Sequence, residues 1–200
     1  MKQPLGVILA GGKATRMGGG DKGLLPLSEG TILDQVIARL SPQVAGMAIN
    51  ANGEAERFAA LGLPVLPDSI ADYPGPLAGV LAGLDWAAGQ GAESVVSVAA
   101  DTPFFPHDLV SRLQFAAEDM EHPLALAATL DGRQPTFGLW PVALRDDLRA
   151  ALQDGLRKVV MWTDRHDGRE ALFDEAGEPF FNVNTPEDLD KAQAMAGGQA

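Results

Sequence analysis

The chain has 200 residues, of which 46% are hydrophobic and 21% are charged, so it can bury a substantial core as one globular domain. Its formal net charge of -12 disfavours binding to nucleic acid or to an anionic membrane surface, and the lack of cysteine excludes disulfides and thiolate chemistry. With no apolar run of about 18 residues and no signal-peptide pattern, we expect a cytoplasmic protein that does not enter membranes.

Short apolar runs alternate with helix-period segments along the first half of the chain. The patterns predict strands at 5–10, 44–50, 63–68 and 93–101. They predict helices at 31–40, 54–62, 76–91 and 106–118. Thr31 is placed to cap the first of these helices, and Pro76 is placed to begin the third.

The second half of the chain continues with strands first and helices later. We expect strands at 124–130 and 135–140, and helical segments at 141–153, 157–162 and 185–196. Alternating strands and helices are typical of a parallel sheet that is covered on both faces. The sequence therefore predicts an α/β fold with a Rossmann-like, doubly wound, mostly parallel sheet and helices on both faces.

Small or polar residues follow each predicted strand of the first half. In sheets of this kind, ligands bind outside the carboxyl ends of the strands. The residues that we expect at this edge are Gly11 and Gly12, Asn50 and Asn52, Asp68, and Asp101.

A glycine-rich segment at 11–23 follows the first strand. Consecutive glycines let main-chain N–H groups turn toward a phosphate, and the cations Lys13, Arg16 and Lys22 outnumber the single Asp21. The alternative is a flexible connection without a ligand. The cations and the position after the first strand favour phosphate binding.

Two standard phosphate motifs do not account for this segment. No window of the chain matches the Walker A pattern G-x-x-x-x-G-K-[ST]. A formal G-x-G-x-x-G match at 18–23 lies well past the strand, and LLPL follows it in place of a helix start. We therefore exclude the dinucleotide-binding fingerprint of oxidoreductases.

The segment LAGGKATRMGGGDKG (9–23) resembles the signature of nucleotidyltransferases that activate small phosphorylated substrates, most closely the molybdenum cofactor guanylyltransferases. The resemblance covers nearly the whole chain and keeps the family's order of motifs. It continues through INAN (49–52), DSIADYPGPLAG (68–79), AADTPF (99–104), RKV (157–159) and FNVNTPEDL (181–189).

The resemblance implies a nucleotide-diphospho-sugar transferase-like fold and a single nucleotidyltransferase domain over 1–200. Its nucleotide-binding half would span about 1–105, and its second-substrate half about 106–195. The implied reaction transfers GMP from GTP to the terminal phosphate of molybdopterin or Mo-molybdopterin, and releases pyrophosphate. The implied cofactor is Mg²⁺, and the implied protein partners deliver molybdopterin or mature molybdoenzymes.

The resemblance also implies roles for individual residues. Asp101 would bind the metal, although the residues alone favour a turn or helix cap before Thr102 and Pro103. Lys22 would neutralise phosphate charge, as would Arg16, and Asp68 would accept from guanine N1–H and N2–H₂. The implied nucleotide contacts are Leu9, Ala10, Gly11, Gly12, Arg16, Lys22, Asn50, Asp68 and Asp101. The implied second-substrate contacts are Lys158, Asn182 and Asn184, for which surface charge and helix capping are the alternatives.

Two other functions stay open at this point. One is a related nucleotidyltransferase that uses CTP with molybdopterin, or another nucleotide with a sugar phosphate. The other is a nucleotide-binding regulator without catalysis. The presence of both Lys22 and Asp101 argues against the regulator.

Overall fold

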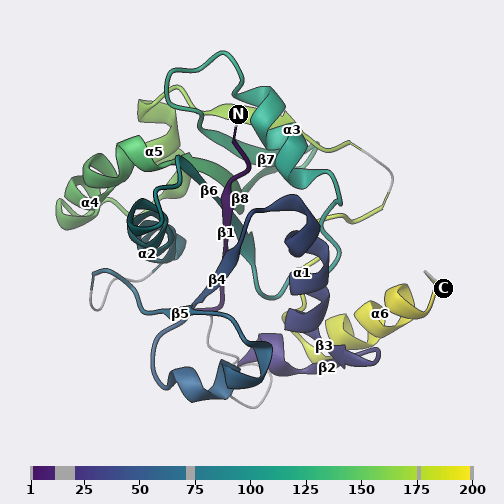
Figure 1. Cartoon of the computed structure of the whole chain (residues 1–200). Helices are drawn as coiled ribbons and strands as arrows, with labels where there is room; N and C mark the ends of the chain where they lie inside the picture. The colour runs from purple at the N-terminus through teal and green to yellow at the C-terminus, as the bar shows by residue number, and fades with distance from the viewer. Residues whose placement is uncertain (1, 12–20, 71–74, 175–176, 199–200) are drawn as a thin grey trace.

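The computed structural model describes residues 2–11, 21–70, 75–174 and 177–198. Across these residues runs a seven-stranded sheet in the order β5-β4-β1-β6-β8-β7-β9 (Figure 1). Its strands are β1 (Leu5–Leu9), β4 (Met47–Asn50), β5 (Val65–Leu66), β6 (Ser94–Ala99), β7 (Ala125–Thr129), β8 (Gly132–Pro141) and β9 (Arg169–Leu172). Strand β8 pairs antiparallel with β6 and β7, and the other neighbours pair in parallel. The predicted mostly parallel sheet is confirmed.

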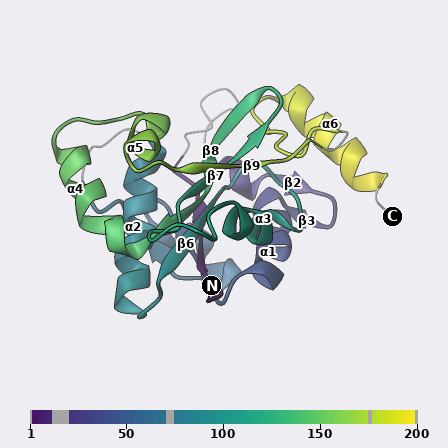
Figure 2. The ribbon, with the colours of Figure 1, turned by 90° about the horizontal axis from the view of Figure 1, so that it is seen from above.

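Helices cover both faces of the sheet (Figure 2). On one face lie α2 (Pro76–Gly89), α4 (Arg145–Gln153) and α5 (Val159–Arg165), and on the other lie α1 (Ile32–Leu40) and α3 (Leu109–Ala116). Val7 packs into the cluster that contains Leu81 and Trp140, whereas its neighbour Ile8 packs into the cluster that contains Leu33. Successive side chains of β1 thus point to opposite, buried faces, which explains the unbroken apolar run.

The last helix, α6 (Pro186–Gly197), packs beside a small hairpin of β2 (Pro26–Leu27) and β3 (Gly30–Thr31). A separate apolar cluster joins them: Leu27, Ile32, Phe104, Val183 and Ala192. Both α1 and α6 begin with a capping box, in which Thr31 pairs with Asp34 and Thr185 pairs with Asp188. These contacts bring the segment that precedes α6 against the first half of the chain.

The structure differs from the predicted elements in three places. Residues 54–62 contain a 3₁₀-helix, η4 (Ala55–Leu61), with one buried side chain, Phe58, in place of an α-helix. Strand β9 was not predicted because, of its four residues, only Ala171 is buried. The hairpin of β2 and β3 was missed because each strand has two residues. Shorter 3₁₀ turns are η2 (Lys22–Leu24), η3 (Ser41–Gln43) and η5 (Val142–Leu144).

No helix in the described part of the chain is long and apolar enough to cross a membrane.

Candidate functional site

The parallel strands β1, β4, β5 and β6 end at the same edge of the sheet, so the residues that follow them lie together. A cavity of about 30 Å³ opens there, enough for one or two water molecules. Its lining is Leu9, Ala10, Asp21, Lys22, Gly23, Leu33, Phe58, Ala100 and Asp101. Leu9, Ala10, Lys22 and Asp101, which the sequence selected from two separate segments, therefore meet in one place.

Lys22 contacts residues from both halves of the chain. Its Nζ donates to Asn184 Oδ1 at 2.5 Å and lies 3.6 Å from Asp101 Oδ2. The Lys22 side chain is 15% exposed and that of Asp101 is 28% exposed, so solvent screens their interaction only in part. An ammonium, a carboxylate and an amide oxygen thus converge beside the end of β6.

Asn182 reaches Asp101 through Thr102, a residue that sequence reasoning did not select. The buried Thr102 hydroxyl lies 3.3 Å from Asp101 Oδ1 and also contacts Asn182 Oδ1. In addition, the main-chain N–H of Val183 donates to the carbonyl of Asp101 at 2.8 Å. The FNVNTPEDL segment is therefore fixed directly against the predicted metal ligand.

Asp188 holds the same segment in place from the first turn of α6. Its Oδ2 accepts from the main-chain N–H groups of Asn184 and Thr185, each at 2.9 Å. The bond from Asn184 is the main reason that the pKa of Asp188 lies below its ordinary value of 3.8. The ionised carboxylate thereby orients the residue that contacts Lys22.

Asp68 lies in a cradle of two asparagines at the ends of β4 and β5. Asn50 Nδ2 donates to Asp68 Oδ1 at 2.9 Å and to the carbonyl of Leu66 at 3.1 Å. Asn52 Nδ2 donates to Asp68 Oδ2 at 2.7 Å, and its Oδ1 accepts from the Asp68 N–H at 2.9 Å. Each carboxylate oxygen keeps further acceptor capacity for a ligand.

Gly79 in α2 makes room for this cradle. A Cβ atom at position 79 would lie 2.1 Å from Asn50 Oδ1 and 2.8 Å from Leu9 Cδ2. Gly79, which ends the family-like stretch DSIADYPGPLAG, therefore admits the buried side chain of Asn50.

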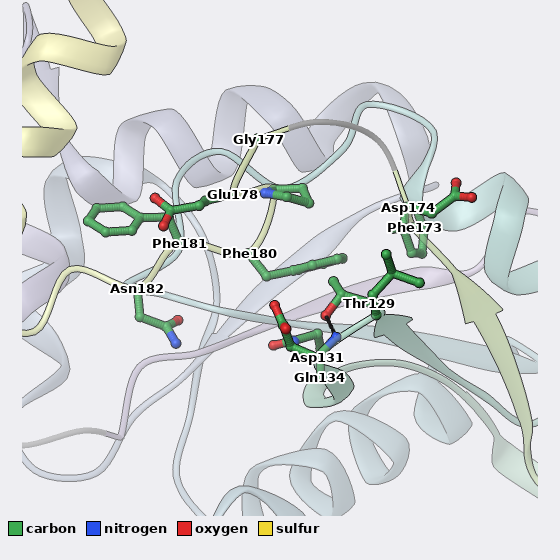
Figure 3. A pocket seen from close by; sticks show the side chains of 12 residues that line it. Thr129, Asp131, Gln134, Phe173, Asp174, Gly177, Glu178, Phe180, Phe181 and Asn182 are labelled. Atoms are coloured by element: carbon green, nitrogen blue, oxygen red, sulfur yellow. Dashed lines mark hydrogen bonds between the residues drawn. The ribbon is translucent and has the colours of Figure 1, made fainter.

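A larger cavity, of about 370 Å³, lies farther along the same edge, between the turn that joins β7 to β8 and the segment that follows β9. Figure 3 shows Asn182 at one end of it, Asp174 at the other, and the ring of Phe180 between them. Because Asn182 also contacts Thr102, this cavity borders the site of Lys22 and Asp101.

Four predicted residues have not yet been placed: Gly11, Gly12, Arg16 and Lys158. Gly11 is described and exposed, whereas Gly12 and Arg16 lie outside the described residues. Lys158 precedes α5 and lines a different cavity, of about 440 Å³, together with Arg157, Met161 and Arg165. The structure thus brings Asn182 and Asn184 to the Lys22 site and places Lys158 in a separate cavity.

Known proteins resemble this chain in both sequence and fold. Residues 6–168 match the family model of the MobA-like NTP transferase domain. A molybdenum cofactor guanylyltransferase from Mesorhizobium japonicum is 50% identical over 196 residues, which cover 95% of this chain and 94% of that protein. A relative of the same name from a Bradyrhizobium species is 49% identical over 195 residues, which cover 96% of this chain and 92% of the relative.

Solved structures share the fold at lower identity. Molybdopterin-guanine dinucleotide biosynthesis protein A from Archaeoglobus fulgidus superposes with a TM-score of 0.74 at 22% identity, over 97% of this chain and 99% of its own. A Mycobacterium tuberculosis protein in complex with manganese gives a TM-score of 0.69 at 19% identity, over 96% and 99% of the two chains. Together with the family model and the curated relatives, the convergence of Lys22 and Asp101 leads to one conclusion: the chain belongs to the molybdenum cofactor guanylyltransferase family.

Proposed function

We propose that this chain transfers GMP from GTP to the terminal phosphate of molybdopterin or Mo-molybdopterin and releases pyrophosphate. The observation that carries the proposal is the meeting of Lys22, Asp101 and Asn184 at the carboxyl edge of the sheet. These residues come from three of the segments that resemble the family, and the identity to its named members extends over 95% of the chain.

The reaction needs positioning and charge neutralisation more than a protein nucleophile. A phosphate oxygen of molybdopterin attacks the α-phosphorus of GTP and forms a new P–O bond. The bond from that phosphorus to the bridging oxygen breaks, and its electron pair leaves with pyrophosphate. Because a phosphate monoester is largely ionised at neutral pH, the chain needs no general base, and the Lys22 ammonium would stabilise charge on the leaving group.

The residues present fit a divalent metal such as Mg²⁺. Within the described residues there is no cluster of three or more His, Asp or Glu side chains that could enclose an ion. Magnesium is commonly held by one or two carboxylates together with substrate phosphates and water, so the single carboxylate of Asp101 suffices. When bound, the metal would supply Lewis acidity at the phosphates.

The nucleotide would extend from Lys22 toward Asp68. A carboxylate that keeps free acceptor positions suits the N1–H and N2–H₂ groups of guanine, and Asn50 and Asn52 hold that carboxylate in a fixed orientation. This assigns base recognition to the strands of the first half, within about 1–105, together with the main chain at Leu9, Ala10 and Gly11.

The second substrate would bind to residues of the second half, within about 106–195. Asn182 and Asn184 support this placement, since both lie against the Lys22 and Asp101 site and Asn182 also lines the cavity of about 370 Å³. Lys158 would contact the substrate from the separate cavity of about 440 Å³. Proteins that deliver molybdopterin or accept the product would complete the pathway of the cofactor.

A panel of nucleoside triphosphates tests the proposal. The purified chain is incubated with molybdopterin, Mg²⁺ and GTP, CTP, ATP or UTP, and pyrophosphate release is measured. We expect release with GTP that requires molybdopterin and is abolished by EDTA. Preference for CTP would contradict the guanine assignment, and GTP binding without any release would favour the regulator.

A further inference from the structure

Arg57 connects parts of the site that lie far apart in the sequence. It belongs to η4, and its Nε donates to Asp21 Oδ2 at 2.5 Å. Its Nη2 donates to the carbonyl of Asn52 at 2.6 Å, and its Nη1 donates to the carbonyl of Glu54. In Figure 1 the blue turn of η4 accordingly lies next to the purple turn that begins at Lys22. Because guanidinium donors are fixed in one plane, these bonds set the relative positions of their three acceptors.

Two residues that accept hydrogen bonds from Arg57, Asp21 and Asn52, lie next to different parts of the proposed nucleotide site. Asp21 lies within the glycine-rich segment and directly precedes Lys22, the proposed phosphate ligand. Asn52 is bonded twice to Asp68, the proposed base ligand. Arg57 is therefore the link between the phosphate end and the base end of the nucleotide site.

An ion pair and an aromatic ring hold the Arg57 side chain in place. The side chains of Arg57 and Asp21 are 27% and 20% exposed, so their ion pair is less screened than a pair on the open surface. The guanidinium carbon also lies 4.6 Å from the ring centroid of Phe58. Phe58 is fully buried and lines the same small cavity as Lys22, so movement of Arg57 would disturb that wall.

We propose that Arg57 is a positioning residue that couples recognition of the base to the placement of Lys22. This inference rests on the proposed function, since it takes Asp68 as the ligand of a 2-amino-6-oxopurine and Lys22 as the ligand of its phosphates. When a base fails to bind Asp68, Asn52 is held less firmly. Arg57 is bonded to both Asn52 and Asp21, so the change in position of Asn52 shifts Asp21 and, with it, Lys22. The wrong base then slows the chemical step as well as weakening binding.

Kinetics with GTP and ITP test the coupling, because ITP lacks only the 2-amino group. In the wild type, loss of one hydrogen bond to a carboxylate should lower kcat for ITP about tenfold as well as raise KM. In Arg57→Met, kcat for GTP should fall about tenfold, so that the kcat ratio of the two nucleotides approaches one. The KM ratio should persist, because Asp68 and Asn52 are unchanged. Arg57→Lys should restore part of the kcat ratio, since its ammonium can pair with Asp21 without spanning both carbonyls.

Arg112→Met is a matched control. Arg112 pairs with Asp108 at 2.8 Å, donates to the carbonyl of Leu172 at 3.1 Å and lies 4.8 Å from the ring centroid of Phe173. It thus resembles Arg57 in its kinds of contact but belongs to α3, outside the nucleotide residues. We expect this variant to keep the kcat ratio of the wild type, and thermal melts of all variants measure any general loss of stability.

Two results would overturn this inference and leave the proposed function intact. One is equal kcat values for GTP and ITP in the wild type, and the other is a decrease of kcat in Arg57→Met by the same factor for both nucleotides. A wild-type chain that releases no pyrophosphate from GTP and molybdopterin would instead contradict the proposed function, and the inference with it.

Discussion

Replacement of Gly79 by alanine tests whether Asn50 is held as the structure indicates. The new Cβ would lie 2.1 Å from Asn50 Oδ1, a distance at which the buried amide must move. Movement breaks the bonds from Asn50 Nδ2 to the carbonyl of Leu66 and to the carboxylate of Asp68. A neutral bond contributes about 0.5–1.5 kcal/mol and a bond to a charged group about 1.5–3 kcal/mol, so the two together contribute about 2–4.5 kcal/mol.

The helix itself offsets part of this loss. Alanine is favoured over glycine within an α-helix by about 1 kcal/mol, so the net destabilisation should be about 1–3.5 kcal/mol. For a chain of this size, each kcal/mol changes Tm by about 2–4 °C, which predicts a decrease of roughly 2–14 °C. Because the orientation of Asp68 is lost as well, the Kd for GTP should rise about tenfold or more.

The assay compares Gly79→Ala with Gly89→Ala, at the end of the same helix. A Cβ at position 89 would have nothing within 4 Å, so that variant should be as stable as the wild type or slightly more stable, with unchanged GTP binding. Thermal melts give the stability, and calorimetric titration with GTP and Mg²⁺ gives the Kd. If Gly79→Ala matched Gly89→Ala in both measurements, the proposed role of Asn50 in holding Asp68 would be wrong.

Two other changes test the charges around Lys22. Asp101→Asn should abolish metal-dependent pyrophosphate release while it strengthens binding of GTP in EDTA, because Lys22 loses its competing carboxylate; retained turnover would refute the metal role. Asp188→Asn should reduce the loss of stability in acid. Because the pKa of Asp188 is lower in the folded chain than its ordinary value of 3.8, the carboxylate stabilises the fold at pH values above 3.8. This stabilisation is lost as the pH falls through the pKa of the folded state. Circular dichroism at pH values on both sides of 3.8 measures the effect, and identical acid unfolding of variant and wild type would contradict it.

The sequence predicted the parts of the site that follow from regular structure. Apolar runs located β1, β4, β5 and β6, and parallel strands place their ends at one edge, so the closeness of Asn50 to Asp68 follows from the fold class. The bridge from Thr102 to Asn182 could not be predicted in this way. It joins side chains 80 residues apart, and it depends on how α6 packs against the hairpin of β2 and β3, which are too short for a pattern to reveal.

The same limit applies to Arg57. Its position in EAERFAALG indicated only a helix, and nothing in that pattern points to Asp21, which lies 36 residues earlier. The segment forms a 3₁₀-helix with one buried side chain, so local periodicity contributes little, and tertiary bonds from Arg57 determine its path. Residues that connect loops are therefore the ones that sequence patterns miss.

The proposed function requires a chain with a net charge of -12 to bind two anionic substrates. A phosphate that approaches Lys22 also approaches Asp101, which lies 3.6 Å from the ammonium, so attraction by one side chain is opposed by repulsion from the other. Free phosphate and metal-free nucleotide should therefore bind weakly. A nucleotide that carries a divalent cation presents charge of both signs and can engage both side chains at once. We therefore expect the pairing of Lys22 with Asp101 to make the site selective for metal-complexed nucleotides over other anions of the cell.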